Sequence, residues 1–332
     1  MTDSHTSPSR VPLSLIDFAN IYRGESAADA FARSVTWAQR AESLGFKRIW
    51  YSEHHNMPSI ASSAPAVLIA HVAAHTASIN LGAGGVMLPN HSPLVIAEQF
   101  GTLAELHPGR IDLGLGRAPG TDQMTMRALR RDVHAADSFP QDVQELDGYL
   151  TDKSVLPGIN AVPGRGTNVP LYILGSSLFG AQLAAQLGLP YSFASHFAPG
   201  ALTQAVQVYR DNYQPSERFP EPYVIAAVNV TAADSEEIAA EHDRRVRRSR
   251  VRAMAGKKLT DAELDLVMDS PAGQRILDML RYTAKGTGEQ VVEYLEEFVE
   301  LSQADELMVA LQSPSTPDSL RNMEILAQHW FA

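Results

Sequence analysis

Residues 79–117 read INLGAGGVMLPNHSPLVIAEQFGTLAELHPGRIDLGLGR, and this stretch contains the unit from which we predict the fold. It begins and ends with short apolar runs, Ile79–Met87 and Arg110–Arg117. Near-continuous apolar runs of this length are typical of parallel strands that are buried on both faces. The residues between them have the spacing of an amphipathic helix, so the stretch predicts a strand, a helix and a parallel strand.

The predicted helix has recognisable ends. Ser92 and Pro93 are typical of a helix start, because a first-turn proline loses no helical hydrogen bond, and Pro108-Gly109 is typical of a helix end. The residues expected on the buried face of this helix are Val95, Ile96, Phe100, Leu103 and Leu106.

The same alternation of apolar and amphipathic runs covers nearly the whole chain. The predicted strands are Val11–Ala19, Phe46–Glu53, Ile79–Met87, Arg110–Arg117, Pro170–Ser176, Tyr191–His196, Tyr223–Thr231 and Glu306–Gln312. Eight strands, each followed by a helix, predict an α/β fold of the (β/α)8 TIM barrel type. A doubly wound open sheet is the alternative, but no G-x-G-x-x-G motif follows the first strand.

Two connections are longer than a single helix requires. They span residues 118–169, after the fourth strand, and residues 232–305, after the seventh, and the second contains a polar helical region around Thr260–Tyr282. Loops that follow barrel strands surround the active site, so we interpret both as insertions that form lid or binding regions. We expect residues 11–332 to form one domain and the polar residues 1–10 to form a disordered leader.

Composition and charge exclude several classes of protein. The net charge of −11 argues against a nucleic-acid partner, and the absence of cysteine excludes thiolate nucleophiles, zinc–thiolate sites and iron–sulfur clusters. No run of about 18 apolar residues predicts a membrane span, so a cytoplasmic enzyme is the expectation. The arginines between Arg244 and Arg252 predict a solvated helix face, with a phosphate or partner contact as the alternative.

The second predicted strand ends in Glu53-His54-His55, where chemistry is expected in a barrel. Side chains alternate along a strand, so Glu53 and His55 share one face and His54 takes the other. A neutral imidazole at this position can transfer a proton near pH 7. A pair of hydrogen-bonded histidines is the alternative. Metal binding is disfavoured, because two adjacent histidines point apart.

The third predicted strand contains Gly82, Gly84 and Gly85. Glycine weakens a strand, so its presence requires a reason. The close approach of a flat ligand, an unusual backbone conformation and the tight packing of small residues are all consistent with these glycines.

The fourth and fifth predicted strands end in residues suited to an anion. Arg117 follows Gly116, and Ser176-Ser177 precedes a helix that begins near Phe179. Arginine binds phosphate through paired hydrogen bonds, and free N–H groups at a helix start attract an anion. Helix capping is the alternative for the two serines. Because the two strands are neighbours, the pattern predicts one phosphate between them and favours a phosphorylated planar cofactor.

At these motifs the chain resembles the bacterial luciferase-like monooxygenase family. The matching pieces are Ile49–His55, Asn80–Pro93, Pro108–Arg117 and Tyr172–Ser177, and order and spacing match from about Val11 to Gly200 and again near Gly286–Gln312. The runs Gly84–Pro89 and Arg117–Gly120 resemble a branch of the family that does not emit light.

The resemblance implies a (β/α)8 barrel that binds FMN at its C-terminal mouth and forms a homodimer through helices near the second and third strands. His54 matches the histidine that the family places near the flavin, and Gly84-Gly85 matches a non-prolyl cis peptide beneath the ring. The implied cofactor-binding residues are Ala83, Gly84, Gly85, Met87, Arg117, Leu174, Gly175, Ser176 and Ser177. Light-emitting members have a glutamate where Gly175 stands, so the phosphate contacts differ here.

The resemblance also implies a reaction. We expect a two-component monooxygenase that uses O2 and reduced FMN, supplied by a partner flavin reductase, on a small organic substrate. Hydride transfer with a deazaflavin and flavin binding without turnover are the alternatives. A metal-dependent hydrolase using His54, His55, His91 or Asp17 is a weaker one, and no metal is expected.

Overall fold

The computed structural model describes residues 10–22, 24–118, 121–132, 134–255 and 259–332. Its centre is a closed barrel of eight parallel strands in the order β6-β5-β4-β3-β2-β1-β9-β7, closed by pairing of β6 with β7. The predicted (β/α)8 fold is therefore confirmed, and the open sheet is excluded. The barrel strands are β1 (Leu13–Asp17), β2 (Arg48–Tyr51), β3 (Asn80–Met87), β4 (Ile111–Gly116), β5 (Leu171–Gly175), β6 (Tyr191–Phe193), β7 (Val224–Ala232) and β9 (Glu306–Leu311).

A ninth strand, β8 (Thr283–Gly286), was missed by the sequence prediction. The short β6 pairs only with Val224–Ala226 of β7, and β8 pairs with Asn229–Ala232 on the further part of the same strand. Its sequence TAKG is brief and alternates in burial, with exposed Lys285 between buried neighbours, so no apolar run marks it. The sequence pattern places these residues in the connection after the seventh predicted strand.

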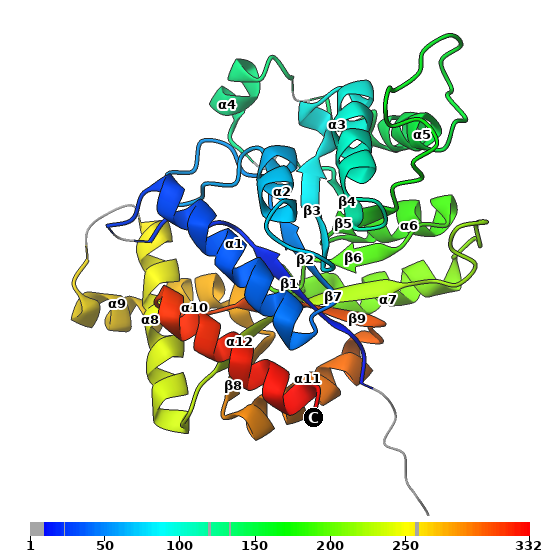
Figure 1. Ribbon diagram of the computed structural model, residues 1–332. Helices are drawn as coiled ribbons and strands as arrows, with labels where there is room; N and C mark the ends of the chain where they lie inside the picture. Colours follow the sequence, from blue (N-terminus) through cyan, green and yellow to red (C-terminus); the bar gives the residue numbers. More distant parts are fainter. Residues whose placement is uncertain (1–9, 23, 119–120, 133, 256–258) are drawn as a thin grey trace, which may run out of the picture.

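Helices surround the barrel, and α1 and α12 lie side by side in contact, so the two ends of the described chain pack together (Figure 1). The helices that follow the first six strands are α1 (Ala27–Leu44), α2 (Pro65–Ala73), α3 (Pro93–Leu106), α4 (Gln123–Ala128), α5 (Phe139–Leu150), α6 (Leu178–Leu187) and α7 (Leu202–Asp211). Those that follow β7 are α8 (Glu236–Ala255), α9 (Asp261–Met268), α10 (Pro271–Leu277), α11 (Gly288–Ser302) and α12 (Thr316–Trp330). No helix among the described residues has the length and apolar character needed to cross a membrane.

The buried face predicted for α3 is partly wrong. Ile96, Phe100 and Leu103 are buried, but Val95 is 44% and Leu106 63% exposed. The buried residues are four and three positions apart and form one narrow stripe, whereas Val95 and Leu106 lie beside it. The helix begins at Pro93 and ends at Leu106, as its predicted boundary residues indicated.

The glycines of β3 have a packing reason. A Cβ at Gly82 would lie 2.7 Å from the Asp112 Cβ and 2.8 Å from the Trp50 ring, and one at Gly85 would lie 2.8 Å from the Gly114 carbonyl oxygen. Distances this short are not tolerated, so glycine is required whether or not a ligand is present. Of the reasons left open by the sequence, the structure supplies two: the tight packing of small residues at Gly82 and Gly85, and an unusual backbone conformation, the cis peptide bond between Gly84 and Gly85.

The two long connections contain the remaining elements. The first, between β4 and β5, includes α4 and α5, and the second, between β7 and β9, includes α8 to α11 and β8. Part of the second connection has its own small core, formed by Val251, Leu264, Leu277 and Leu280. The single-domain assignment remains a prediction. Residues 1–9 of the predicted leader and the motif residues Pro119 and Gly120 lie outside the described residues.

Candidate functional site

The side chains that face the barrel axis at the C-terminal strand ends define the candidate site. Phe18 follows β1, His54 follows β2 and His196 follows β6. The Phe18 ring lies 6.1 Å from the ring of His54 and 5.9 Å from that of His196, measured between centroids. Because β9 and β7 separate β1 from β6 in the barrel, the second contact crosses the barrel mouth.

His54 is half-buried and held from two sides. Its Nδ1 lies 3.1 Å from the Ser52 hydroxyl, and its backbone N–H donates to the Ser62 carbonyl at 3.0 Å. Burial lowers the pKa of His54, against a smaller opposing effect of the Glu53 carboxylate. The imidazole is therefore neutral at pH 7 and able to accept a proton, as the predicted role requires.

The alternation predicted after β2 is confirmed. His55 turns away from His54 and its Nε2 lies 2.8 Å from Oε1 of the buried Glu53, and His91 Nε2 lies 2.8 Å from the same oxygen. Glu53 Oε2 also accepts the backbone N–H of Met87 at 3.1 Å. These contacts orient both rings. A cavity of about 110 Å³ lies next to Glu53 and His91 and is also lined by residues of α2 and α3.

Glu53, His55 and His91 are the described residues whose ligand atoms, all within 4.8 Å of one another, could hold a metal ion. The weaker hydrolase alternative had named His54 and Asp17 as well. Neither belongs to this cluster, and the carboxylate of Asp17 instead accepts hydrogen bonds from Ser34 and from the backbone of Ala19. Hydrogen bonds to Glu53 already account for the position of both histidine rings.

His196 is a site residue that the sequence analysis did not single out, although it ends the sixth predicted strand. Its side chain is buried, and neither ring nitrogen has a hydrogen-bond partner among the described residues. Burial lowers its pKa to about 3, with a further contribution from the charge of Arg250. The sequence does contain a signal for His196, because a histidine at the C-terminal end of a barrel strand is a candidate site residue. The sequence analysis applies this criterion only to His54, after the second strand.

The residues of the predicted anion site lie at the neighbouring ends of β4 and β5. The Arg117 guanidinium lies over the ring of Phe179, 4.1 Å from its centroid, in the first turn of α6. Ser177 occupies the capping position of α6, but its side chain forms no capping hydrogen bond. Ser176 and Ser177 are exposed, and no carboxylate among the described residues pairs with Arg117. A cation, two hydroxyls and free N–H groups thus lie together where a phosphate was expected.

The other predicted cofactor residues lie on β3 and β5. Met87 and Leu174 are half-buried at the ends of β3 and β5, and Ala83 is buried. Gly84 and Gly85 are joined by a cis peptide bond, as the resemblance implied. At Gly175 an added Cβ would meet only ordinary contacts, 3.6 Å from the Tyr191 hydroxyl, so the methyl group of an alanine fits there.

The arginines of α8 are mostly paired. Arg244 and Arg245 pair with Glu241, Arg247 with Asp243, Arg248 with Asp261 and Asp265, and Arg252 with Asp261. Arg250 is half-buried and has no such partner among the described residues. The arginines from Arg244 to Arg252, apart from Arg250, therefore form surface ion pairs, in agreement with the predicted solvated helix face.

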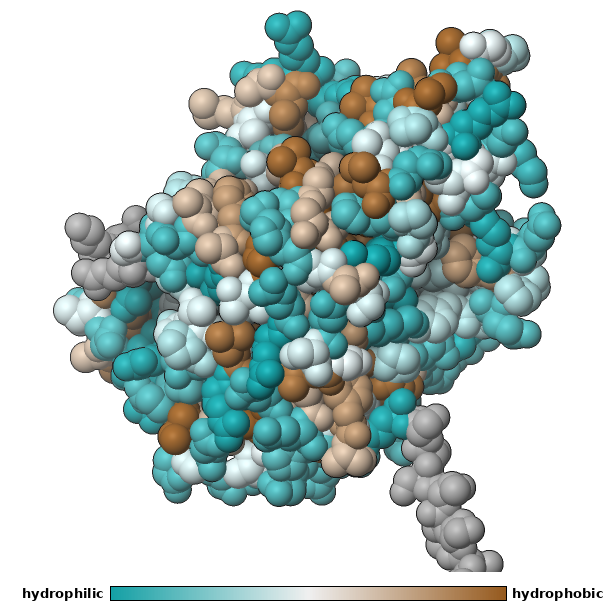
Figure 2. Space-filling model, in the orientation of Figure 1, coloured by the Kyte–Doolittle hydropathy of each residue, from teal (hydrophilic) through white to brown (hydrophobic). Residues whose placement is uncertain are grey.

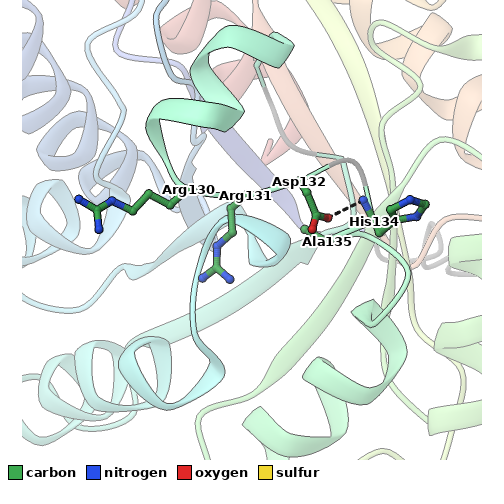
Figure 3. A pocket seen from close by; sticks show the side chains of 5 residues that line it. All are labelled: Arg130, Arg131, Asp132, His134 and Ala135. Carbon is green, nitrogen blue, oxygen red and sulfur yellow. Dashed lines mark hydrogen bonds between the residues drawn. The ribbon is translucent and has the colours of Figure 1, made fainter.

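A surface depression between α4 and α5 is lined by Arg130, Arg131, Asp132, His134 and Ala135 (Figure 3). The His134 backbone N–H donates to the Asp132 carboxylate at 2.8 Å, and the two arginine side chains point away from that pair. The depression contains none of the predicted site residues. Its side chains are largely exposed, so it provides no enclosed environment for chemistry.

The fold is a (β/α)8 barrel with His54, Arg117 and His196 directly after the C-terminal ends of its strands. The luciferase-like monooxygenase family matches residues 13–304, and the chain belongs to this family. Relatives include a luciferase-like monooxygenase of Escherichia coli (strain K12), 56% identical over 226 residues that cover 68% of each chain. The uncharacterized protein YvbT of Bacillus subtilis (strain 168) is 44% identical over 324 residues that cover 96% of each chain.

Solved structures share the fold. Apo-MsnO8 superposes with a TM-score of 0.86 at 32% identity, covering 97% of this chain and 99% of that one. The oxygenating constituent of 3,6-diketocamphane monooxygenase from Pseudomonas putida, in complex with FMN, has a TM-score of 0.71 at 16% identity, and covers 96% of this chain and 97% of that one. A relative with a stated substrate, the N-acetyl-S-alkylcysteine monooxygenase of B. subtilis (strain 168), is 39% identical over 195 residues, covering 55% of this chain and 57% of that one.

Proposed function

We propose that this protein is a two-component monooxygenase that binds reduced FMN at the barrel mouth, acts in the cytoplasm and receives the flavin from a separate reductase. The observation that carries the proposal is the position of Arg117 over the first turn of α6, whose start is not capped by the Ser177 side chain. A phosphate bound there would supply the anion that these groups lack. Family membership supports the oxygenating chemistry.

FMN fits the residues at this end of the barrel. Its phosphate would be held by Arg117, Ser176, Ser177 and the free N–H groups of α6, and its ring would lie toward the cis-linked Gly84-Gly85. Reduced FMN, when bound, supplies the electrons that activate molecular oxygen. The chain itself orients the cofactor and limits the access of water to the mouth.

His54 is the group that we propose to hold or move a proton at Nε2. Its Nδ1 is directed to the Ser52 hydroxyl, so Nε2 is the nitrogen left for the cofactor or substrate. Burial lowers its pKa, which keeps the ring neutral at pH 7, and Nε2 then accepts a proton in the tautomer whose Nδ1–H donates to the Ser52 hydroxyl. The Phe18 ring lies between the rings of His54 and His196, with its centroid 6.1 Å and 5.9 Å from theirs.

The test is an equilibrium titration of the purified protein with reduced FMN, oxidised FMN and a deazaflavin, for wild type and two variants. Arg117→Gln removes the proposed phosphate contact, and Arg127→Gln removes an exposed arginine of α4 as the matched control. We expect FMN to bind and the Arg117 variant to bind it at least about tenfold more weakly. Equal FMN affinity in the two variants would contradict the proposed phosphate site, and preferential binding of the deazaflavin would favour hydride transfer.

Oxygen consumption with reduced FMN then tests the reaction. The substrate panel should include aldehydes, ketones, sulfonates and an N-acetyl-S-alkylcysteine, the compound class that one relative is named for. We expect at least one compound to couple oxygen consumption to an oxygenated product. Flavin binding without coupled product for any compound would favour a flavin-binding protein without turnover.

We also propose a homodimer that forms through α2 and α3. Val67 on α2 is 71% exposed, and Val95 and Leu106 on α3 are 44% and 63% exposed. Figure 2 shows brown, apolar patches over these helices. Apolar side chains grouped in this way are typical of protein interfaces. Sedimentation should therefore give a dimer, and Val67→Glu should shift the protein toward the monomer.

A further inference from the structure

The first observation concerns the buried imidazole of His196. Its main chain is fixed, because the Asn229 side chain donates to the His196 carbonyl at 2.8 Å and Gln312 in turn donates to the Asn229 side chain at 2.8 Å. Its ring reaches Phe18 across the mouth, yet neither ring nitrogen has a partner among the described residues. A buried polar group without a partner is unfavourable, so this ring is placed for a ligand that the chain alone does not supply.

The second observation concerns the direction of Arg250. On α8, Ala239, Asp243 and Arg250 are four and seven residues apart and therefore share one stripe of the helix. Ala239 and Asp243 are buried, and Asp243 contacts Lys285 of β8 at 3.1 Å. Arg250 thus lies on the stripe of α8 that faces the sheet, unlike the exposed Arg244 and Arg245. Consistently, burial lowers its pKa.

The two groups lie at the same height along the barrel. Arg250 is seven residues beyond Asp243, about 10 Å along a helix, and Tyr282 is three residues before Lys285, about 10 Å along a strand. A helix that follows a strand runs back along it, so these offsets have the same direction. The Tyr282 carbonyl shares the Asn229 side-chain amide with the His196 carbonyl, at 3.3 Å and 2.8 Å. Arg250 therefore lies at the height of His196 along the barrel, where β6 ends and β8 begins, and its charge acts on the His196 imidazole.

We propose that Arg250 and His196 form a subsite for the carboxylate or sulfonate group of the organic substrate. The proposal rests on the function proposed above and names the substrate class as an organic anion. A half-buried guanidinium without a carboxylate is completed by an anion that takes two of its N–H groups, and a neutral imidazole donates a further hydrogen bond. The remainder of the substrate would then extend past Phe18 toward His54, where the reaction is proposed.

The test is a binding titration that requires no turnover. Protein with isotope-labelled histidine is titrated with butane-1-sulfonate, butyrate and neutral butyramide, and the His196 ring resonance, identified with His196→Gln, reports binding. We expect a saturable shift with both anions and none with the amide. Arg250→Gln should weaken anion binding at least about tenfold, while the matched surface variant Arg244→Gln should leave it unchanged. Equal shifts with butyramide, or unchanged binding in Arg250→Gln, would overturn the proposal.

An FMN titration of the same variants separates this inference from the proposed function. We expect Arg250→Gln to bind FMN as wild type does, because the phosphate contacts proposed above lie at β4 and β5. If Arg250→Gln weakened FMN binding as much as Arg117→Gln, the anion bound at Arg250 would be the cofactor phosphate, and the substrate subsite would be refuted. If FMN did not bind to any variant while the anions still bound at Arg250, the proposed function would fail and the anion subsite would remain.

Discussion

The two ends of the barrel differ in how their buried polar groups are paired. At the lower end, where the strands begin, Arg48 lies between the buried carboxylates of Asp112 and Glu306. At the upper end, where the strands finish, His54 and His196 lie on either side of the Phe18 ring. Arg48 donates to Asp112 at 2.7 Å, to the Tyr172 hydroxyl at 2.8 Å and to Glu306 at 3.3 Å. At the other end, the His196 ring has no partner among the described residues. The buried polar groups of the lower end are thus hydrogen-bonded to one another, whereas the buried His196 ring of the upper end is not.

The carboxylates of the lower end respond differently to the same arginine. Burial raises the pKa of Asp112 more than Arg48 lowers it. Glu306 is also buried, but the charges of Arg48 and Lys47 and hydrogen bonds from Ser14 and Tyr223 hold its pKa below the ordinary value. The lower end is therefore a network in which each charge depends on the others for its stability, whereas the upper end leaves polar groups available for a ligand. Stability and function should accordingly separate along the barrel axis.

The largest expected effect is on the lower end. Arg48→Met leaves Asp112 and Glu306 buried without their main cation, so we expect the free energy of unfolding to fall by about 3–5 kcal/mol. Lys47→Met is the matched control, because Lys47 is 38% exposed while contacting the same Glu306 at 3.0 Å, and its loss should cost at most about 1 kcal/mol. Urea unfolding of both variants measures the difference. Equal effects would mean that the buried network does not stabilise the barrel.

The corresponding change at the upper end should affect turnover and leave stability nearly unchanged. His54→Gln keeps a polar side chain in the half-buried position but cannot exchange a proton, so we expect kcat to fall by about 10²-fold or more. The free energy of unfolding and the affinity for FMN should remain close to those of wild type. Steady-state oxygen consumption and an FMN titration measure these quantities. A variant with normal flavin binding and full turnover would remove His54 from the proposed mechanism.

The glycines allow a third comparison, between the barrel interior and its mouth. In Gly82→Ala the new methyl group would lie 2.7–2.8 Å from Asp112 and Trp50, so overpacking should reduce the free energy of unfolding by about 1–3 kcal/mol. In Gly175→Ala the nearest atoms are 3.6 Å away, and we expect a change within about 0.5 kcal/mol. Thermal and urea unfolding of both variants test this difference. A larger loss for Gly175→Ala would indicate that the mouth is packed as closely as the interior.

These glycines also illustrate what can be predicted from sequence. The eight barrel strands were predictable because each is an apolar run bounded by turn residues, and the helix start at Pro93 because proline favours that position. The reason for Gly82 could not be predicted, because it depends on Trp50 and Asp112, whose atoms approach Gly82 from the neighbouring strands. Sequence identified the position as unusual, and only the packing around it distinguishes a ligand surface from a crowded interior.

The candidate site was predictable to the same degree. His54, Arg117 and Ser176 stand directly after apolar runs, so their place at the mouth followed from the fold. The ion pairs of the α8 arginines could not be predicted in this way. Asp261 and Asp265 belong to α9, and no local sequence pattern indicates how α9 packs against α8. The same holds for β8, whose four residues form a strand only because β6 leaves the edge of β7 free. The periodicity of apolar residues predicts individual helices and strands, but it does not predict the contacts between elements that are distant in sequence.

A pH dependence of stability is also expected to arise at the upper end. Burial, aided by the charge of Arg250, lowers the pKa of His196 to about 3, whereas the unfolded chain takes up this proton near pH 6.5. As the pH falls below about 6.5 the unfolded state therefore binds one more proton than the folded state, and stability declines by up to about 1.4 kcal/mol per pH unit. Between pH 7 and pH 5 the loss from this residue should be about 2 kcal/mol, and at pH 7–8 it should vanish.

His196→Gln removes this group, and the difference between the two proteins isolates its contribution from that of His54, whose pKa burial also lowers. In urea unfolding at several pH values, wild type should lose about 2 kcal/mol more stability than His196→Gln between pH 7 and pH 5, and the two curves should run parallel above pH 7. Curves that stay parallel down to pH 5 would mean that the ring is protonated in the folded state. The upper end would then hold a fixed positive charge beside Arg250, and the contrast between the two ends of the barrel would no longer stand.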